Sequence, residues 1–228
     1  MKIGHLQKVS LIDYPGKISA IVFTQGCNFR CPYCHNPELV DPARYGPCLP
    51  EEVIFSYLEK RRGKLEGVVI TGGEPTIQGD LAPFLRTVKD MGYLVKLDTN
   101  GSRPERLAEL LEAGLIDYLA MDIKAPLRKY TSVTGTPGSG QTIKQSIALI
   151  MAAHISCEFR TTIAGSQLSA ADLLRIGQLI PGAPLYALQM ARQGKALEAQ
   201  FLHTPVQGDD FTSLKNVLQK SIKKVIIR

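Results

Sequence analysis

Residues 24–37 read TQGCNFRCPYCHNP and place Cys27, Cys31 and Cys34 at a C-x3-C-x2-C spacing. Four cysteines would complete a tetrahedral zinc site or ligate every iron of a four-iron cluster, whereas three thiolates leave one iron open to another ligand. His35 would be the fourth ligand of a zinc site, but it is adjacent to Cys34 and poorly placed to close the same tetrahedron. A redox-active cysteine pair would leave Cys27 unused. The spacing therefore favours a 4Fe-4S cluster with one iron that has no protein ligand.

Short apolar segments rich in β-formers alternate with helical patterns along the chain. Strands are predicted at residues 17–26, 67–73, 94–101, 118–125, 157–165 and 185–190, and helices at 50–63, 81–92, 102–114, 141–154, 168–180 and 209–224. Such alternation is typical of βα units around a parallel sheet. Six units are fewer than the eight of a closed TIM barrel, so the sequence predicts an α/β fold with a partial, open (β/α)6 TIM-type barrel.

The 228 residues are expected to form a single domain, because α/β domains commonly reach this size. Within it we expect an N-terminal β-hairpin at residues 1–16, a partial barrel at 17–190, and a C-terminal helix and tail at 191–228. The YPGK segment, residues 14–17, is typical turn sequence and would form the tip of the hairpin.

Composition indicates a globular chain. Apolar residues make up 44% of it, and the longest apolar runs are far shorter than the roughly 18 residues of a membrane span. The N-terminus has no apolar signal-peptide region, so we expect a cytoplasmic protein with no membrane partner. The net charge of +6 is spread along the chain, which disfavours nucleic acid as a partner. Cys48 and Cys157 lie outside the cluster spacing, and we interpret them as incidental and as strand core.

Glycine and polar residues follow the predicted strands at the end where the chemistry of βα barrels gathers. Gly72, Gly73 and Glu74 follow the second strand. Two glycines let the backbone approach a ligand closely, and a carboxylate accepts hydrogen bonds from a cationic ammonium group. DTNG, residues 98–101, ends the third strand, and DIKAP, residues 122–126, ends the fourth. Taken singly, each of these segments would be an ordinary turn or cap.

The cysteine spacing, with aromatic Tyr33 before the last cysteine and GGEP after the second strand, resembles the radical S-adenosylmethionine (radical SAM) superfamily. The resemblance implies that the three cysteines hold a 4Fe-4S cluster whose open iron chelates SAM. One electron then splits SAM into methionine and a 5′-deoxyadenosyl radical. The resemblance also implies that Tyr33 lies near the adenine and that residues 72–74 receive the SAM amino group.

The segments CHN (34–36), LDTNG and MDIKAP extend the resemblance to the activating enzymes of glycyl-radical enzymes. This branch implies a set of SAM contacts, namely Asp98, Thr99, Asn100, Asp122 and Lys124. It also implies that the two aspartates help to hold a monovalent cation beside the SAM carboxylate. Arg160 matches an arginine that can reach the methionine or ribose part of SAM, and a salt bridge within the barrel is the alternative role.

Residues 6–40 most resemble the activating proteins of anaerobic ribonucleoside-triphosphate reductase. The implied function is an oxidoreductase that cleaves SAM and generates a glycyl radical on that enzyme, with a flavodoxin or a ferredoxin as electron donor. DYPGK departs from the Asp-Gly-Pro-Gly element of many activators, so another glycyl-radical enzyme, such as pyruvate formate-lyase, is an alternative partner. Two further alternatives are a radical SAM enzyme that acts on a small molecule and a non-catalytic zinc or iron-sulfur binding module.

Overall fold

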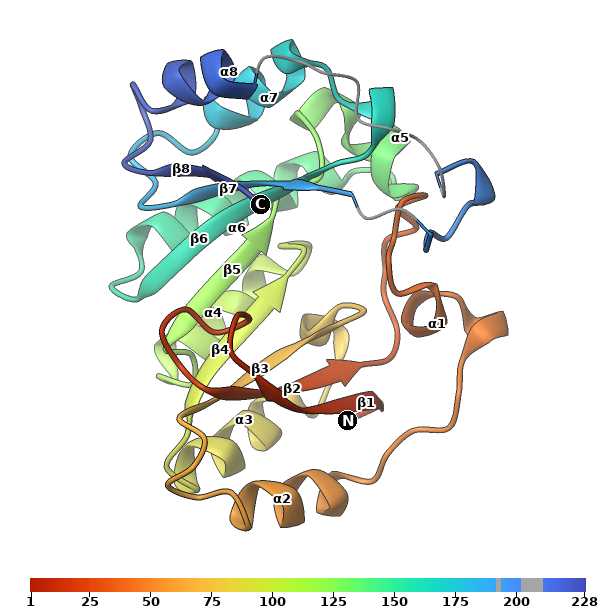
Figure 1. Ribbon diagram of the computed structural model, residues 1–228, viewed down its shortest axis with the longest axis vertical. Helices are drawn as coiled ribbons and strands as arrows, with labels where there is room; N and C mark the ends of the chain where they lie inside the picture. Colours follow the sequence, from red (N-terminus) through yellow and green to blue (C-terminus); the bar gives the residue numbers. More distant parts are fainter. Residues whose placement is uncertain (192–193, 202–210) are drawn as a thin grey trace. The chain divides into compact units, whose positions relative to one another are not determined.

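The computed structural model describes residues 1–191, 194–201 and 211–228 (Figure 1). From the second strand onward, strands and helices alternate along the chain, which confirms the α/β class. The chain divides into two compact units. Unit 1 comprises Met1–Asn28, Glu38–Thr99 and Glu105–Leu119, and unit 2 comprises Phe29–Pro37, Asn100–Pro104 and Ala120–Arg228.

Eight strands in the described residues form one sheet, in which the strand order follows the chain from β1 to β8. Strand β1 is antiparallel to β2, whereas the pairs β2–β3, β3–β4, β6–β7 and β7–β8 are parallel. Strands β2 to β7 coincide with the six predicted segments. The bounds are β1 Ile3–Ser10, β2 Ser19–Thr24, β3 Gly67–Gly72, β4 Leu94–Thr99, β5 Tyr118–Asp122, β6 Ser156–Ile163, β7 Tyr186–Met190 and β8 Val225–Ile227.

The six predicted helices correspond to α2, α3, α4, α6, α7 and α8, while the short α1 and α5 were not predicted. The bounds are α1 Pro37–Val40, α2 Glu51–Glu59, α3 Leu81–Asp90, α4 Pro104–Glu112, α5 Tyr130–Thr134, α6 Ser139–Ala152, α7 Ala170–Gly177 and α8 Phe211–Leu218. The predicted start of the last helix, residues 209–210, lies outside the described residues. Within the described part of the chain, no helix combines the length and apolarity that crossing a bilayer requires.

The N-terminal hairpin differs from the expected one in its second arm. Strand β1 pairs with β2, so the hairpin shares its second strand with the barrel and does not end at residue 16. The YPGK turn is confirmed, because the Lys17 N–H donates to the Tyr14 carbonyl at 3.1 Å and Gly16 has a φ of 72°. Only glycine adopts this left-handed conformation without strain. Tyr14 is buried and packs with Ile21 and Val69 in the core of unit 1.

The C-terminus carries a strand where we expected a tail. The main chain of β8 pairs in parallel with β7, and Val225 lies beside Tyr186 in the register. The Arg228 guanidinium reaches the buried Glu158 carboxylate at 2.9 Å. This strand was not predicted because three residues are too few to show the alternation of a strand. The lysines that precede it also made the segment look like a solvent-exposed tail.

Helix α7 begins with a capping box. The Ser169 hydroxyl accepts the Asp172 N–H, and the Asp172 carboxylate accepts the Ser169 N–H, so two otherwise unpaired donors are satisfied. Lys129 also donates to the Asp172 carboxylate at 2.5 Å. Burial alone would raise the pKa of Asp172, but the hydrogen bonds from Lys129 and Ser169 outweigh it and lower the pKa to about 2.

A carboxyl whose pKa is lowered by folding stabilises the protein above its unfolded pKa, and the stabilisation is lost as the pH falls through the folded value. We therefore expect Asp172→Asn to lower the free energy of unfolding at pH 7 by up to about 2 kcal/mol. The deficit should shrink below pH 4 and vanish near pH 2. Urea unfolding at several pH values measures it, with Asp90→Asn, an exposed carboxyl on α3, as control. A deficit that stays constant down to pH 2 would contradict this account.

Candidate functional site

The cysteine stretch begins in unit 1 and continues in unit 2. Cys27 is half-buried and follows Gly26, whose N–H donates to the Leu39 carbonyl at 2.7 Å. In unit 2, the Cys34 N–H donates to the Cys31 carbonyl at 3.0 Å, which places both residues on one tight turn. None of the five cysteines of the chain forms a disulfide. The three predicted ligands are thus all reduced, as iron-sulfur ligation requires.

Cys31 lies in a buried and charged environment. Its side chain is 7% exposed, and burial raises the pKa of the thiol to about 11, although the nearby Lys124 ammonium acts in the opposite direction. The thiol is therefore protonated at neutral pH in the metal-free protein. A metal that binds Cys31 must displace this proton, as metals generally do when they bind cysteine.

Tyr33, the predicted adenine contact, belongs to the interior of unit 2. It is 4% exposed, and burial raises the pKa of its hydroxyl well above the usual value. The charges of Cys31, Lys124 and Asp122 also influence this pKa, so these groups are neighbours of the tyrosine. The Tyr33 ring lies 6.5 Å from the ring of Phe201 between centroids. Its contact with adenine stays a prediction.

Gly72, the last residue of β3, and Gly73 after it make unusually close backbone contacts in unit 1. A Cβ atom on Gly73 would lie 1.9 Å from the Gly26 carbonyl oxygen, and one on Gly72, where φ is 111°, would lie 2.5 Å from the Thr24 nitrogen. The Gly73 N–H donates to the Thr24 carbonyl at 2.9 Å, and the Glu74 N–H donates to the Gly26 carbonyl at 2.8 Å. The glycines thus let the loop after β3 approach the start of the cysteine stretch.

Glu74 holds its carboxylate in a fixed orientation. The side chain is 1% exposed, and its Oε1 accepts hydrogen bonds from the Thr76 N–H at 3.1 Å, the Thr76 hydroxyl at 2.5 Å and the Thr99 hydroxyl at 2.7 Å. Three donors on one oxygen prevent the carboxylate from rotating. The sequence predicted Glu74 and Thr99, but Thr76 could be found only from the structure.

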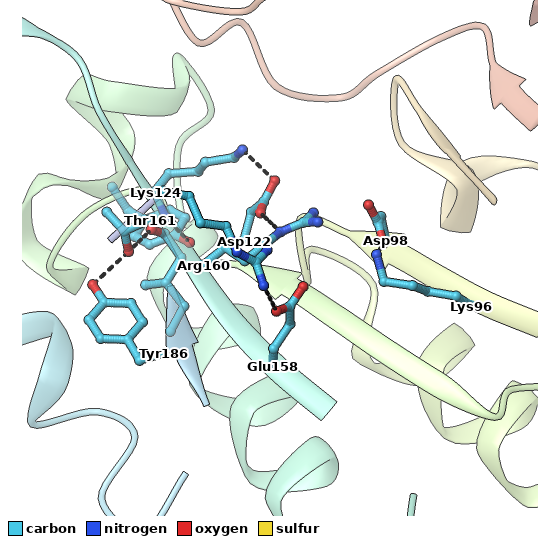
Figure 2. A network of polar contacts seen from close by, with 11 residues as sticks. Lys96, Asp98, Asp122, Lys124, Glu158, Arg160, Thr161 and Tyr186 are labelled. Carbon is cyan, nitrogen blue, oxygen red and sulfur yellow. Dashed lines mark hydrogen bonds and ion pairs between the residues drawn. The ribbon is translucent and has the colours of Figure 1, made fainter. Parts of the chain in front are cut away.

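Strand β4 brings a lysine to the site that the sequence analysis did not single out. Lys96 is 2% exposed, and its Nζ lies 2.7 Å from Oδ1 of Asp98 (Figure 2). A lysine within the apolar run LVKL was the available signal, because lysine is almost never fully buried unless it is paired. Of the predicted site residues, unit 1 thus brings Gly72, Gly73 and Glu74 close to Gly26, and Thr99 donates a hydrogen bond to Glu74.

Asn100 makes the turn contact that its sequence context predicts. Its side-chain Oδ1 accepts the Ser102 N–H at 2.9 Å, an arrangement typical of asparagine in turns. Asn100 is 6% exposed and belongs to unit 2. Asn100 therefore has the structural role of a turn residue, and its contact with SAM stays a prediction.

Asp122, Lys124 and Arg160 form one ion-paired group in unit 2. The Arg160 Nε lies 2.7 Å from Oδ1 of Asp122, and the Lys124 Nζ lies 2.9 Å from Oδ2 (Figure 2). Burial by itself would raise the pKa of Asp122, but the two cations lower it well below its usual value. Burial opposes the charge on Lys124, yet Asp122 raises its pKa well above the usual value. The salt bridge considered for Arg160 is therefore present.

Buried hydroxyl groups support this ion-paired group from the same unit. The Lys124 N–H donates to the Tyr130 hydroxyl at 3.0 Å, and the ring of Tyr130 lies edge-on to that of Phe29. The Thr161 hydroxyl donates to the Ile123 carbonyl and accepts a hydrogen bond from Tyr186, both at 2.8 Å. These contacts fix the main chain directly after Asp122 and Arg160.

Comparison with known proteins identifies the family of this chain. The sequence pattern of the Radical SAM superfamily matches residues 21–167, more than half of the chain. The "Putative glycyl-radical enzyme activating enzyme MJ1227" of Methanocaldococcus jannaschii is 34% identical over 232 residues, which cover 99% of this chain and 95% of the relative. A pyruvate formate-lyase-activating enzyme of Clostridium pasteurianum is 32% identical over 54% of this chain and 52% of its own length.

Solved structures show the same fold at low sequence identity. SuiB of Streptococcus suis has a TM-score of 0.67 at 12% identity, over 91% of this chain and 48% of its own. TYW1 with a lysine-pyruvate adduct bound has a TM-score of 0.62 at 15% identity, over 89% and 73% of the two chains. The predicted partial TIM-type barrel is confirmed by these neighbours.

The chain therefore belongs to the Radical SAM superfamily and, within it, to the activating enzymes of glycyl-radical enzymes. Enzymes of this superfamily use a 4Fe-4S cluster, as the three-cysteine spacing predicted, and SAM, as the family resemblance implied.

The close contact at Gly73 leads to a test of stability. Alanine at this position would bring a methyl group against the Gly26 carbonyl, so we expect Gly73→Ala to lower the free energy of unfolding by about 3 kcal/mol. Gly79→Ala is the matched control, because no atom lies within 4 Å of a Cβ built there. Urea unfolding of both variants measures the difference. Equal stabilities would show that the contact is unimportant.

Proposed function

We propose that the protein generates a glycyl radical on a partner enzyme and that this partner is anaerobic ribonucleoside-triphosphate reductase. The observation that carries the activating role is the 34% identity to the M. jannaschii relative over nearly the whole of both chains. The choice of the reductase is supported by the sequence of residues 6–40, which resembles that of reductase activators. Pyruvate formate-lyase is the alternative partner, and a flavodoxin or ferredoxin is the proposed electron donor.

Cys27, Cys31 and Cys34 are the proposed ligands of the cluster. Their chemistry fits it, because three thiols at this spacing occupy three irons and leave the fourth open to SAM. When bound, the cluster supplies the electron that splits SAM into methionine and a 5′-deoxyadenosyl radical. The burial of Cys31 and Tyr33 excludes water from this part of unit 2, which protects reactive species from side reactions.

Glu74 is the proposed acceptor for the SAM ammonium group. Its Oε1 is held by Thr76 and Thr99, so the carboxylate is oriented before a ligand arrives. In unit 2, Arg160 and Lys124 are the proposed partners of the anionic or hydroxyl groups of SAM, and Asp122 holds both cations in place. Gly72, Asp98, Asn100 and Tyr33 complete the proposed SAM contacts.

A radical SAM enzyme acting on a small molecule is the second candidate. A 7-carboxy-7-deazaguanine synthase of Methanopyrus kandleri is 33% identical over 132 residues, but this match covers only 50% of the chain. The match to the activating enzyme of M. jannaschii covers 99%. The activating role is therefore better supported.

Iron content tests the proposed ligands. Anaerobically reconstituted protein should be brown and hold about four irons per chain. Cys31→Ala should lose the colour and most of the iron, because two thiolates cannot retain the cluster. Cys157→Ala is the matched control, since Cys157 is 8% exposed, much like Cys31, but lies on β6 outside the motif. Retention of four irons by Cys31→Ala, or one zinc in a colourless wild-type protein, would refute the assignment.

Radical formation tests the activity and the partner together. We expect anaerobic incubation with SAM, a reductant and anaerobic ribonucleoside-triphosphate reductase to produce a glycyl radical in the EPR spectrum of the reductase, with release of 5′-deoxyadenosine. Pyruvate formate-lyase in place of the reductase should give a much weaker signal. A strong signal with pyruvate formate-lyase alone would correct the partner. Consumption of SAM without a radical on either protein would favour the small-molecule reading.

A further inference from the structure

Lys96 extends across an apolar face of unit 1. In the register of the parallel pair β3–β4, Lys96 lies beside Val69, which belongs to the buried core with Tyr14 and Ile21. The Lys96 Nζ also lies 5.8 Å from the centre of the Tyr118 ring. An ammonium group in such surroundings loses its hydration, so it requires a nearby anion.

Asp98 supplies that anion from the same strand. Residues two positions apart in a strand project from the same face, so the lysine stem runs along the sheet toward Asp98 (Figure 2). The 2.7 Å distance between Nζ and Oδ1 is that of a close ion pair. The two groups together carry no net charge at the carboxyl end of β4.

A buried ion pair of this kind is not explained by stability. Removing two charges from water costs about as much as their attraction returns, and an apolar side chain of similar size would fill the same space. A methionine or leucine at position 96 would continue the apolar face of Ile21 and Val69 without that cost. We therefore attribute the presence of the ammonium to its charge beside Asp98.

The resemblance to glycyl-radical activators implies that the two strand-end aspartates help to hold a monovalent cation, and the residues of this chain do not fit one. Asp98 is paired with Lys96, and Asp122 is paired through its two oxygens with Arg160 and Lys124. A monovalent cation binds a carboxylate because the carboxylate needs a positive charge. In each unit, protein side chains already supply it.

We propose that the Lys96 ammonium takes the place of the monovalent cation at Asp98, so that this enzyme binds SAM without sodium or potassium. This inference rests on the proposed function, because it assumes that Asp98 belongs to the SAM site. Lys96 is thus a positioning residue. Like an alkali ion, it neutralises Asp98, whose negative charge would otherwise repel the SAM carboxylate.

The first test uses the wild-type protein with its reconstituted cluster. The dissociation constant of SAM is measured by isothermal titration calorimetry in choline chloride, sodium chloride and potassium chloride at equal ionic strength. We expect values that agree within about twofold, since no alkali ion takes part. Affinity that falls about tenfold or more in choline chloride would overturn the inference.

The second test removes the internal cation. Lys96→Met keeps the length and apolar character of the stem, so we expect SAM affinity to fall about tenfold in choline chloride and to recover when potassium or sodium is added. Lys89→Met is the matched control, because Lys89 pairs with Asp117 at 2.6 Å in the same unit but lies on α3. It should leave SAM affinity unchanged in every salt.

The outcomes separate the two proposals. If SAM fails to bind the wild-type protein in all three salts, the proposed function fails, whatever the role of Lys96. If SAM binds equally in all salts but Lys96→Met, shown by circular dichroism to be folded, binds as well as wild type in choline chloride, only the role of Lys96 is overturned. Should this variant not fold, the salt comparison on the wild type still decides the inference.

Discussion

The contact between the Gly73 and Gly26 backbones is the constraint on which the site in unit 1 depends. It joins the loop after β3 to the residue that precedes the first motif cysteine, at a separation that admits no side chain at position 73. The Glu74 N–H completes the contact, so its carboxylate is placed by the main chain before Thr76 and Thr99 orient it. The Gly-Gly-Glu motif therefore has a structural role as well: it joins the loop after β3 to the loop that carries Gly26.

Electrostatics at the strand ends follow one principle in both units. Each carboxylate is paired with nearby cations: Asp98 with Lys96 of the same strand, and Asp122 with Lys124 of the following loop and Arg160 of β6. Fixed charges in a buried setting cost little to reorganise when a ligand arrives, because they are already oriented by strands and hydroxyl groups. SAM carries both positive and negative groups, so preorganised pairs suit it better than isolated charges.

The sequence predicted most of the fold because the alternation of apolar strands and amphipathic helices is a local signal. Strands β2 to β7 and the six longer helices were found, whereas β8 and α5 were too short to show a period. Cys31 was singled out by cysteine spacing, and Glu74 and Asp122 were singled out by their motifs after predicted strands; their roles stay predictions. Lys96 and Thr76 were not, because their roles arise from burial and from partners that only the folded strands bring near. The YPGK turn was predicted, but the second arm of the hairpin was not, because that arm is the first barrel strand, β2.

The sequential order of the sheet has a consequence for synthesis on the ribosome. All residues of unit 1 lie before position 120, so its strands and the Gly73 contact can form while the later strands are still being translated. Strand β8 can pair with β7 only after residues 225–227 have been translated. A chain that lacked residues 225–227 would leave β7 with an exposed edge, which invites aggregation.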